Sequence, residues 1–224
     1  MSNFLSRVMD KTYYKFLQDD GQAPYATNFH WPLQKNGKPG KYLPRIKEPL
    51  EMCRIGYHLA TEDNLIDWIE PHLYICELAK NSEIVVGDNN ICTSGRIRLV
   101  KKVETWNERT ARLFAADCAE RALPIFEKER PDDDRPRKAI EAARKFVAGE
   151  IDKQELDAAR DAARAAARAA ARDAGAAAWA AAWAAAAGEA AWAAAGEAAR
   201  AAAGAAEENA QNDLLLQYIR GERG

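Results

Sequence analysis

Hydrophobic residues in the first hundred positions form short runs separated by turn residues. Tyr13 to Phe16 is an aromatic run, and Arg96 to Val103 alternates in part, as half-exposed strands do. Lys35 to Gly40 has the composition of an exposed turn. We expect short strands at residues 13–16, 25–31, 53–59, 72–78, 83–87 and 96–103. They predict an α+β domain over residues 1–105, built on a small, mostly antiparallel sheet.

One small helix is expected between two of these strands. Thr61 carries a side chain suited to an N-cap. Leu65, Trp68 and Ile69 follow with helical spacing, and Pro71 should end the helix.

From Trp106 onward the apolar spacing becomes helical. The first helix of this region contains Pro124, which should kink or end it. Its apolar stripe covers about four turns. The stripe consists of Leu113, Phe114, Cys118, Ala122, Leu123 and Phe126.

Capping residues mark two further helices. Pro136 suits the first turn of one, and Gly149 suits its C-terminal end. Asp152 and Glu155 have the spacing of a capping box at the start of the next. The sequence therefore predicts a helical second domain over residues 106–224.

Alanine dominates the rest of the chain and supplies 34 of the 60 residues from Ile151 to Ala210. Because alanine favours helix and has a small side chain, closely packed helices are expected. Glycines interrupt the region, and we expect the chain to break near Gly175 or Gly188 and fold back. Three tryptophans should fill the spaces between these helices: Trp179, Trp183 and Trp192. A compact apolar anchor should close the chain: Leu214, Leu215, Leu216, Tyr218 and Ile219.

Charge and composition restrict the class of partner and the compartment. The 224 residues carry 32 basic and 34 acidic side chains, so the net charge of −2 lacks the bulk signature of a duplex-binding protein. Charged residues interrupt the alanine region, so we expect no membrane span there. The first twenty residues lack the pattern of a signal peptide, which favours a cytoplasmic protein.

The cysteines give no metal-binding pattern. Cys53, Cys76, Cys92 and Cys118 are scattered, and only three histidines accompany them. A structural zinc site needs clustered thiolates and imidazoles. We therefore expect reduced cysteines within the core, no structural metal and no cofactor.

The segment around His58 is the strongest candidate for chemistry. Arg54, Tyr57 and His58 could hold a nicotinamide nucleotide, as in ADP-ribosyl-transfer sites, with Glu77 or Glu104 stabilising positive charge on the ribose. The simpler interpretation is a structural His58 bonded within the fold.

Two basic groups are candidates for binding. Arg96 and Arg98 are two apart on a predicted strand and therefore share a face, where they could hold a phosphate or an acidic partner. Arg160, Arg164, Arg168 and Arg172 recur every four residues and form a slowly winding stripe that could contact a partner protein or track nucleic acid. In both cases a solvated charged surface is the simpler interpretation.

Four stretches of the chain resemble uncharacterised bacterial and bacteriophage proteins. They are Arg54 to His58, Asp88 to Arg98, Phe114 to Pro124 and Pro131 to Glu150, the last with the core Arg137-Lys138-Ala139-Ile140-Glu141-Ala142-Ala143-Arg144. In the proteins it resembles, this last run often precedes Ala/Trp/Arg repeats and is labelled immunity-protein-like. The resemblance implies an alanine-rich helical C-terminal domain and brings no catalytic residues.

The resemblance and the patterned helical surface favour stoichiometric binding. We expect a phage or bacterial immunity or anti-defence factor that inhibits an unidentified protein partner, and catalysis is not expected. The alternative is an ADP-ribosyltransferase-like or nucleotide-binding domain centred on His58.

Overall fold

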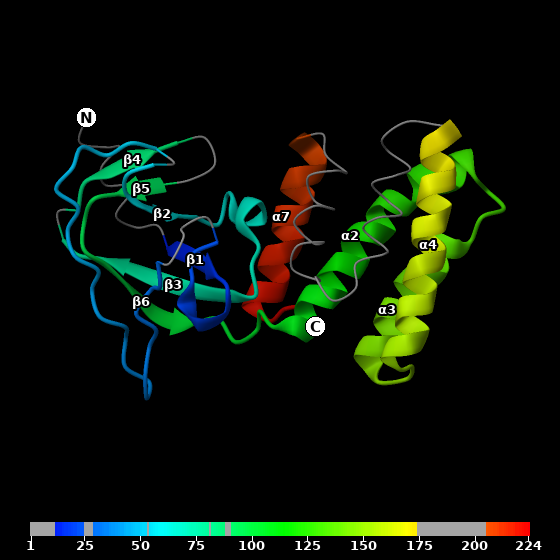
Figure 1. Ribbon diagram of the computed structural model, residues 1–224, viewed down its shortest axis with the longest axis horizontal. Helices are drawn as coiled ribbons and strands as arrows, with labels where there is room; N and C mark the ends of the chain where they lie inside the picture. The colour runs from blue at the N-terminus through cyan, green and yellow to red at the C-terminus, as the bar shows by residue number, and fades with distance from the viewer. Residues whose placement is uncertain (1–11, 25–28, 53, 81, 88–90, 174–204) are drawn as a thin grey trace. The chain divides into compact units, whose positions relative to one another are not determined.

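The computed structural model of the chain describes residues 12–24, 29–52, 54–80, 82–87, 91–173 and 205–224. The chain divides into two compact units, Met1–Glu104 and Thr105–Gly224, which we call the sheet unit and the helical unit. Strands lie in the first and long α-helices in the second (Figure 1). This α+β arrangement confirms the predicted fold class.

Two antiparallel three-stranded sheets form in the described part of the sheet unit, with strand orders β1-β3-β6 and β2-β5-β4. The strands are β1 (Tyr13–Leu17), β2 (Tyr57–Leu59), β3 (His72–Leu78), β4 (Ile84–Val86), β5 (Ile91–Thr93) and β6 (Ile97–Lys102). The pattern did not predict β5 as a strand, because its three residues lie between two turn signals. Yet β5 is central in its sheet.

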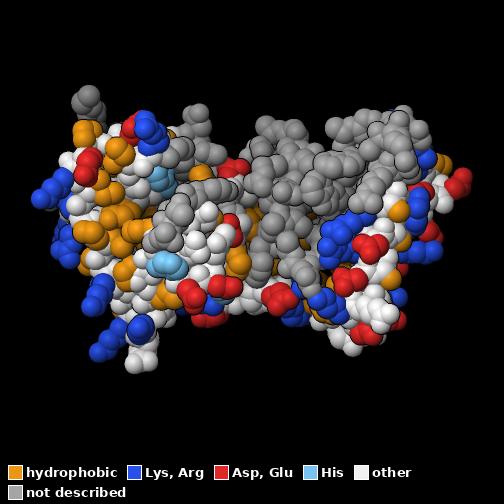
Figure 2. All heavy atoms as spheres, viewed as in Figure 1, with side chains coloured by type: hydrophobic (Ala, Val, Ile, Leu, Met, Phe, Trp, Pro, Cys, Tyr) orange, Lys and Arg blue, Asp and Glu red, His pale blue; other side chains and the backbone are white. Residues whose placement is uncertain are grey.

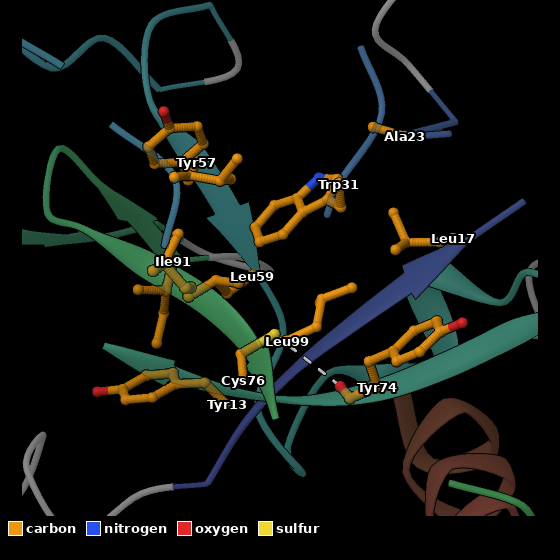
Figure 3. Packing of buried hydrophobic residues seen from close by; sticks show 12 residues of the cluster. Tyr13, Leu17, Ala23, Trp31, Tyr57, Leu59, Tyr74, Cys76, Ile91 and Leu99 are labelled. Atoms are coloured by element: carbon orange, nitrogen blue, oxygen red, sulfur yellow. Dashed lines mark hydrogen bonds between the residues drawn. The ribbon is translucent and has the colours of Figure 1, made fainter. Parts of the chain in front are cut away.

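The core of the sheet unit lies between the inner faces of the two sheets (Figure 3). Cys76 on β3 pairs with Tyr13 on β1 and with Leu99 on β6, so three strands contribute adjacent side chains. Leu59 and Ile91 face each other on the second sheet and join the same cluster. Alternation along each strand places these residues on one face.

An irregular segment, residues 40–46, lies along the outer edge of β6. The backbone N–H of Gly40 donates to the carbonyl of Leu99 over 2.8 Å, and that of Leu43 donates to Ile97 over 2.7 Å. Pro44 has no N–H to donate, which prevents a continuous ladder. The segment nevertheless covers the edge of the sheet.

The predicted helix after Thr61 is wrong in extent and in its cap. Only a single 3-10 turn forms, η2 (Leu65–Trp68). Thr61 does not cap it; instead the Thr61 N–H donates to the Asn64 side-chain oxygen over 2.8 Å. This short turn already buries Leu65 and Ile66, so packing is satisfied without further helical residues.

The strand predicted at 25–31 does not form in its described part. His30 makes only an isolated bridge with Gln22. Pro32 follows directly and cannot donate a ladder hydrogen bond. Trp31 instead enters the core, where it is 3 % exposed. Residues 25–28, Cys53 and the turn at 88–90 lie outside the described residues.

The helical unit begins with a long helix that continues through its internal proline. Its described helices are α2 (Glu108–Glu129), α3 (Arg135–Ala148), α4 (Lys153–Asp173) and α7 (Ala205–Arg220). Asn107 and Thr110 form a capping box at the start of α2. Pro124 does not end α2, which continues to Glu129. Burial of the neighbouring Leu123 and Phe126 favours the continued helix.

The predicted caps of the next two helices are confirmed. Pro136 lies in the first turn of α3, and Gly149 ends it in the left-handed conformation with φ of 75°. Asp152 and Glu155 exchange backbone-to-carboxylate hydrogen bonds of 2.9 and 3.0 Å at the start of α4. Local chemistry thus fixed these boundaries.

Small side chains make the contacts between helices α2, α3 and α4. Ala119, Ala139 and Ala163 are at most 1 % exposed and belong to one cluster. On α7 the predicted apolar anchor is confirmed, since Leu215 is fully buried and Tyr218 packs edge-on against Phe114 at 6.1 Å. The predicted breaks at Gly175 or Gly188 and the three tryptophans lie outside the described residues.

Candidate functional site

Tyr57 and His58 lie next to each other on β2, so their side chains point to opposite faces of the sheet. Tyr57 lies in the core beside the rings of Phe29 and Trp31, and its hydroxyl donates to the carbonyl of Pro44 over 2.8 Å. His58 is the next residue along the strand and therefore points to the other face. The two side chains do not converge on one ligand site.

His58 lies beside a very small cavity. The cavity has a volume of about 10 Å³ and is lined by residues that include Lys15, His58 and Trp68. The Lys15 ammonium donates to the carbonyl of His58 over 3.0 Å. Such a volume holds about one water molecule, whereas ligand pockets measure hundreds of cubic ångströms. The geometry gives the nucleotide-binding alternative no support.

Burial dominates the titration of the groups at this cavity. It lowers the pKa of Lys15 to about 8. Burial, together with the charge of Lys15, also lowers the pKa of His58. Both groups are therefore shifted toward their neutral forms.

The remaining residues of the predicted nucleotide site lie elsewhere. Arg54 is exposed and pairs with Glu51 over 2.7 Å. Glu77 and Glu104 are not among the residues that line the small cavity. The structure does not assemble the predicted group around His58.

Arg96 and Arg98, in contrast, come together around one aromatic ring. The guanidinium carbons of Arg96 and Arg98 lie 5.0 and 4.5 Å from the centre of the Tyr42 ring. Arg98 donates from Nε and Nη2 to one oxygen of Glu77, over 3.0 and 2.7 Å. The Tyr42 hydroxyl donates to the other Glu77 oxygen over 2.7 Å. Sequence analysis missed Tyr42, since only tertiary contact brings residue 42 beside β6.

Tyr42 and Arg98 stabilise the ionised form of Glu77. The hydrogen bond from Tyr42, followed by that from Arg98, lowers the pKa of Glu77. Hydrogen bonds to the ionised form favour it. The arrangement therefore stabilises a negatively charged oxygen at the surface of the sheet.

The arginines of α4 do not form one uniformly exposed stripe. Arg160 shares a face with the buried Leu156 and Ala163, at spacings of four and three residues. Its side chain is 19 % exposed, and its Nε atom is buried without a hydrogen-bond partner among the described residues. Arg164 is 37 % exposed and pairs with Asp161 over 3.5 Å. The side chains of Arg168 and Arg172 lie outside the description.

A groove in the helical unit was not predicted. It has a volume of about 340 Å³ and is lined by Glu108, Arg112, Phe146, Lys153, Leu156 and Asp157. Arg112 lies over the Phe146 ring at 5.2 Å and pairs with Glu108 over 2.6 Å. The groove thus combines apolar walls with charges of both signs. No sequence signal marks it, because its residues come from three helices.

The described part of the chain shows neither a metal-binding cluster nor a membrane-spanning helix. No group of three or more His, Cys, Asp or Glu side chains that could hold a metal occurs among the described residues. No helix in the described part of the chain is long and apolar enough to cross a membrane. Cys76, Cys92 and Cys118 are buried thiols, as expected.

Comparison with known proteins identifies the class to which the helical unit belongs. Residues 101–219 match the family model described as Imm-5 like putative immunity protein. Because the match covers more than half of the chain, the chain belongs to this family. No curated protein and no solved structure matches it. The family relationship supports the immunity-type assignment and a protein partner.

Proposed function

We propose that this chain is an immunity-type inhibitor that neutralises one partner protein by binding it stoichiometrically. The observation that carries the proposal is the near coincidence of the family match, residues 101–219, with the compact helical unit Thr105–Gly224. We further propose that residues 1–105 and 106–224 are separate domains, and that the partner is a bacterial or phage toxin or defence protein met in the cytoplasm.

The groove of the helical unit is the proposed contact surface. Phe146 offers apolar area, while Arg112 and the exposed Lys153 offer positive charge at its border. Aromatic residues and arginine are enriched in protein interfaces. Arg164, on the following turns of α4, would extend this surface, together with Arg160, Arg168 and Arg172.

A rigid frame supports the groove. Asp117 on α2 accepts from Arg144 on α3 over 2.8 Å and from Tyr218 on α7 over 2.8 Å. Three helices are thereby tied at one buried point. A preorganised surface loses less conformational entropy on binding, which favours tight inhibition.

The test is co-expression of the full chain with a panel of candidate bacterial and phage toxins. We expect restored growth and a 1:1 complex by native mass spectrometry. Lys153→Glu at the groove should weaken the complex at least about tenfold, because it replaces a positive charge of the proposed contact surface with a negative one. Lys145→Glu, an exposed lysine of α3 outside the groove, is the matched control and should bind normally.

Two results would contradict the proposal. One is protection of growth at amounts of chain far below those of the toxin, which would indicate catalysis. The other is full protection without a measurable complex.

A further inference from the structure

We propose that the sheet unit carries a second binding surface, a basic strip that holds an acidic segment of a protein partner. The strip consists of residues 35–47 and 96–102. Together these two segments contain nine Lys and Arg residues and no Asp or Glu. Residues 35–47 lie wholly before the family match, so the proposal does not rest on the function proposed for the helical unit.

Backbone hydrogen bonds fix the two segments side by side. Gly40 and Leu43 donate to Leu99 and Ile97 on β6, and Ile46 donates to Ser94 over 3.1 Å. Charges that are about fifty positions apart in the sequence therefore share one sheet edge. Seven of the nine basic residues are exposed. Figure 2 shows Lys and Arg side chains gathered along an edge of this unit.

Arg96 is the proposed anchor of the strip. Its side chain is exposed and stacks on the Tyr42 ring, and this side chain forms no ion pair or hydrogen bond within the described residues. Guanidinium groups bind carboxylates through paired N–H donors. Stacking orients the guanidinium in advance, so a carboxylate can bind with less loss of side-chain freedom.

Glu77 already shows that this surface holds carboxylates. One of its side-chain oxygens accepts a hydrogen bond from Tyr42, and the other accepts from Arg98. Arg98 is two residues after Arg96 in the chain. An acidic partner segment would place further carboxylates beside Arg96 and the exposed lysines. Arginine clusters recognise acidic motifs in this way.

An acidic protein segment suits the strip better than single-stranded nucleic acid. Binding of single strands relies on aromatic rings on which bases stack. The Tyr42 ring is already covered by two guanidinium groups, and its hydroxyl is bonded to Glu77. The net charge of −2 also makes the remainder of the chain a poor support for a long polyanion.

The test measures fluorescence anisotropy of a labelled peptide of alternating Glu and Ser with the full chain at low salt. We expect saturable, salt-sensitive binding, and weak binding of the same peptide with Gln in place of Glu. Arg96→Glu should weaken binding at least about tenfold. Lys41→Glu is a second variant at an exposed position of the strip and should weaken binding in the same direction. Arg54→Glu is the control, an exposed arginine of the same unit outside the strip.

Equal binding of the Glu and Gln peptides would overturn the proposal. So would equal losses in Arg96→Glu and in Arg54→Glu, because the strip would then contribute no more than general charge. Oligothymidylate and unlabelled peptide can be compared as competitors of the labelled peptide. If oligothymidylate displaces the labelled peptide at the lower concentration, the strip binds nucleic acid instead. None of these results bears on toxin neutralisation by the helical unit, which is measured separately.

Discussion

Arg144 on α3 donates to Asp117 on α2 over 2.8 Å, although the Asp117 side chain is only 6 % exposed. Asp117 also accepts from the Tyr218 hydroxyl, and it pairs with Arg223 over 2.9 Å. One buried carboxylate thus collects donors from residues that are up to about a hundred positions apart. It joins α2 to α3, to α7 and to the end of the chain.

Asp117→Ala should destabilise the helical unit by about 2–3 kcal/mol. The substitution leaves the buried Tyr218 hydroxyl without its acceptor and removes the partner of two arginines. The measurement is urea unfolding followed by circular dichroism. Glu120→Gln is the control, since Glu120 pairs with the same Arg144 but is 57 % exposed. It should cost less than about 1 kcal/mol, and equal losses in the two variants would contradict the assignment of Asp117.

Lys15→Met should stabilise the sheet unit at pH 7 by about 2 kcal/mol. Burial lowers the pKa of Lys15 from 10.5 to about 8. One pKa unit corresponds to about 1.4 kcal/mol, and the lost hydrogen bond to His58 offsets about 1 kcal/mol of the gain.

The lowered pKa of Lys15 also predicts that the free energy of unfolding of the sheet unit depends on pH. Between pH 8 and 10.5 the unfolded chain holds a proton that the folded chain has released, so the free energy of unfolding rises with pH across this window. Below pH 8 the cost of the buried charge is fully present. Lys15→Met should remove this part of the rise, whereas Lys38→Met, at an exposed turn, should not. Unfolding curves from pH 7 to 10.5 measure the difference, and parallel curves for the two variants would refute the assignment.

Pro124→Ala should stabilise α2 by about 1–2 kcal/mol. Proline in a helix interior removes a backbone hydrogen bond and costs about 3 kcal/mol relative to alanine, although its rigidity also restricts the unfolded chain. Pro124 is exposed, so its replacement disturbs no packing. Pro136→Ala, in the first turn of α3, provides the comparison and should bring no gain. Thermal unfolding measures the stability of the two variants. An equal gain in stability for Pro136→Ala and Pro124→Ala would contradict the prediction.

Gly40→Ala should loosen the segment that carries Tyr42. A Cβ at this position would collide with the backbone carbonyl of Pro32. We expect a loss of more than about 2 kcal/mol and weaker binding of the acidic peptide. Gly37→Ala has φ of 73° but open space around the Cβ, so it should cost only about 1 kcal/mol and leave peptide binding intact. Unimpaired peptide binding by folded Gly40→Ala would show that the segment does not position the strip.

Sequence periodicity predicted β3 at residues 72–78 with the bounds that the structure has. It failed for the helix after Thr61, because a single turn already buries the two apolar residues that needed covering. At Pro124 local propensity predicted a kink or an end, and the end does not occur, because α2 continues to Glu129. Arg96 and Arg98 were identified as neighbours on one face, but the residue that organises them was not.

The sequence by itself determined the fold class, the positions of most strands and the ends of α3 and α4. These features depend on residues within one turn or one strand of each other, such as Gly149, or Asp152 with Glu155. Tertiary structure alone decided that Tyr42 lies against Arg96 and that Asp117 meets Arg144 and Tyr218. Such contacts join positions far apart in the chain, and local propensities carry no information about which distant partner satisfies a buried polar group.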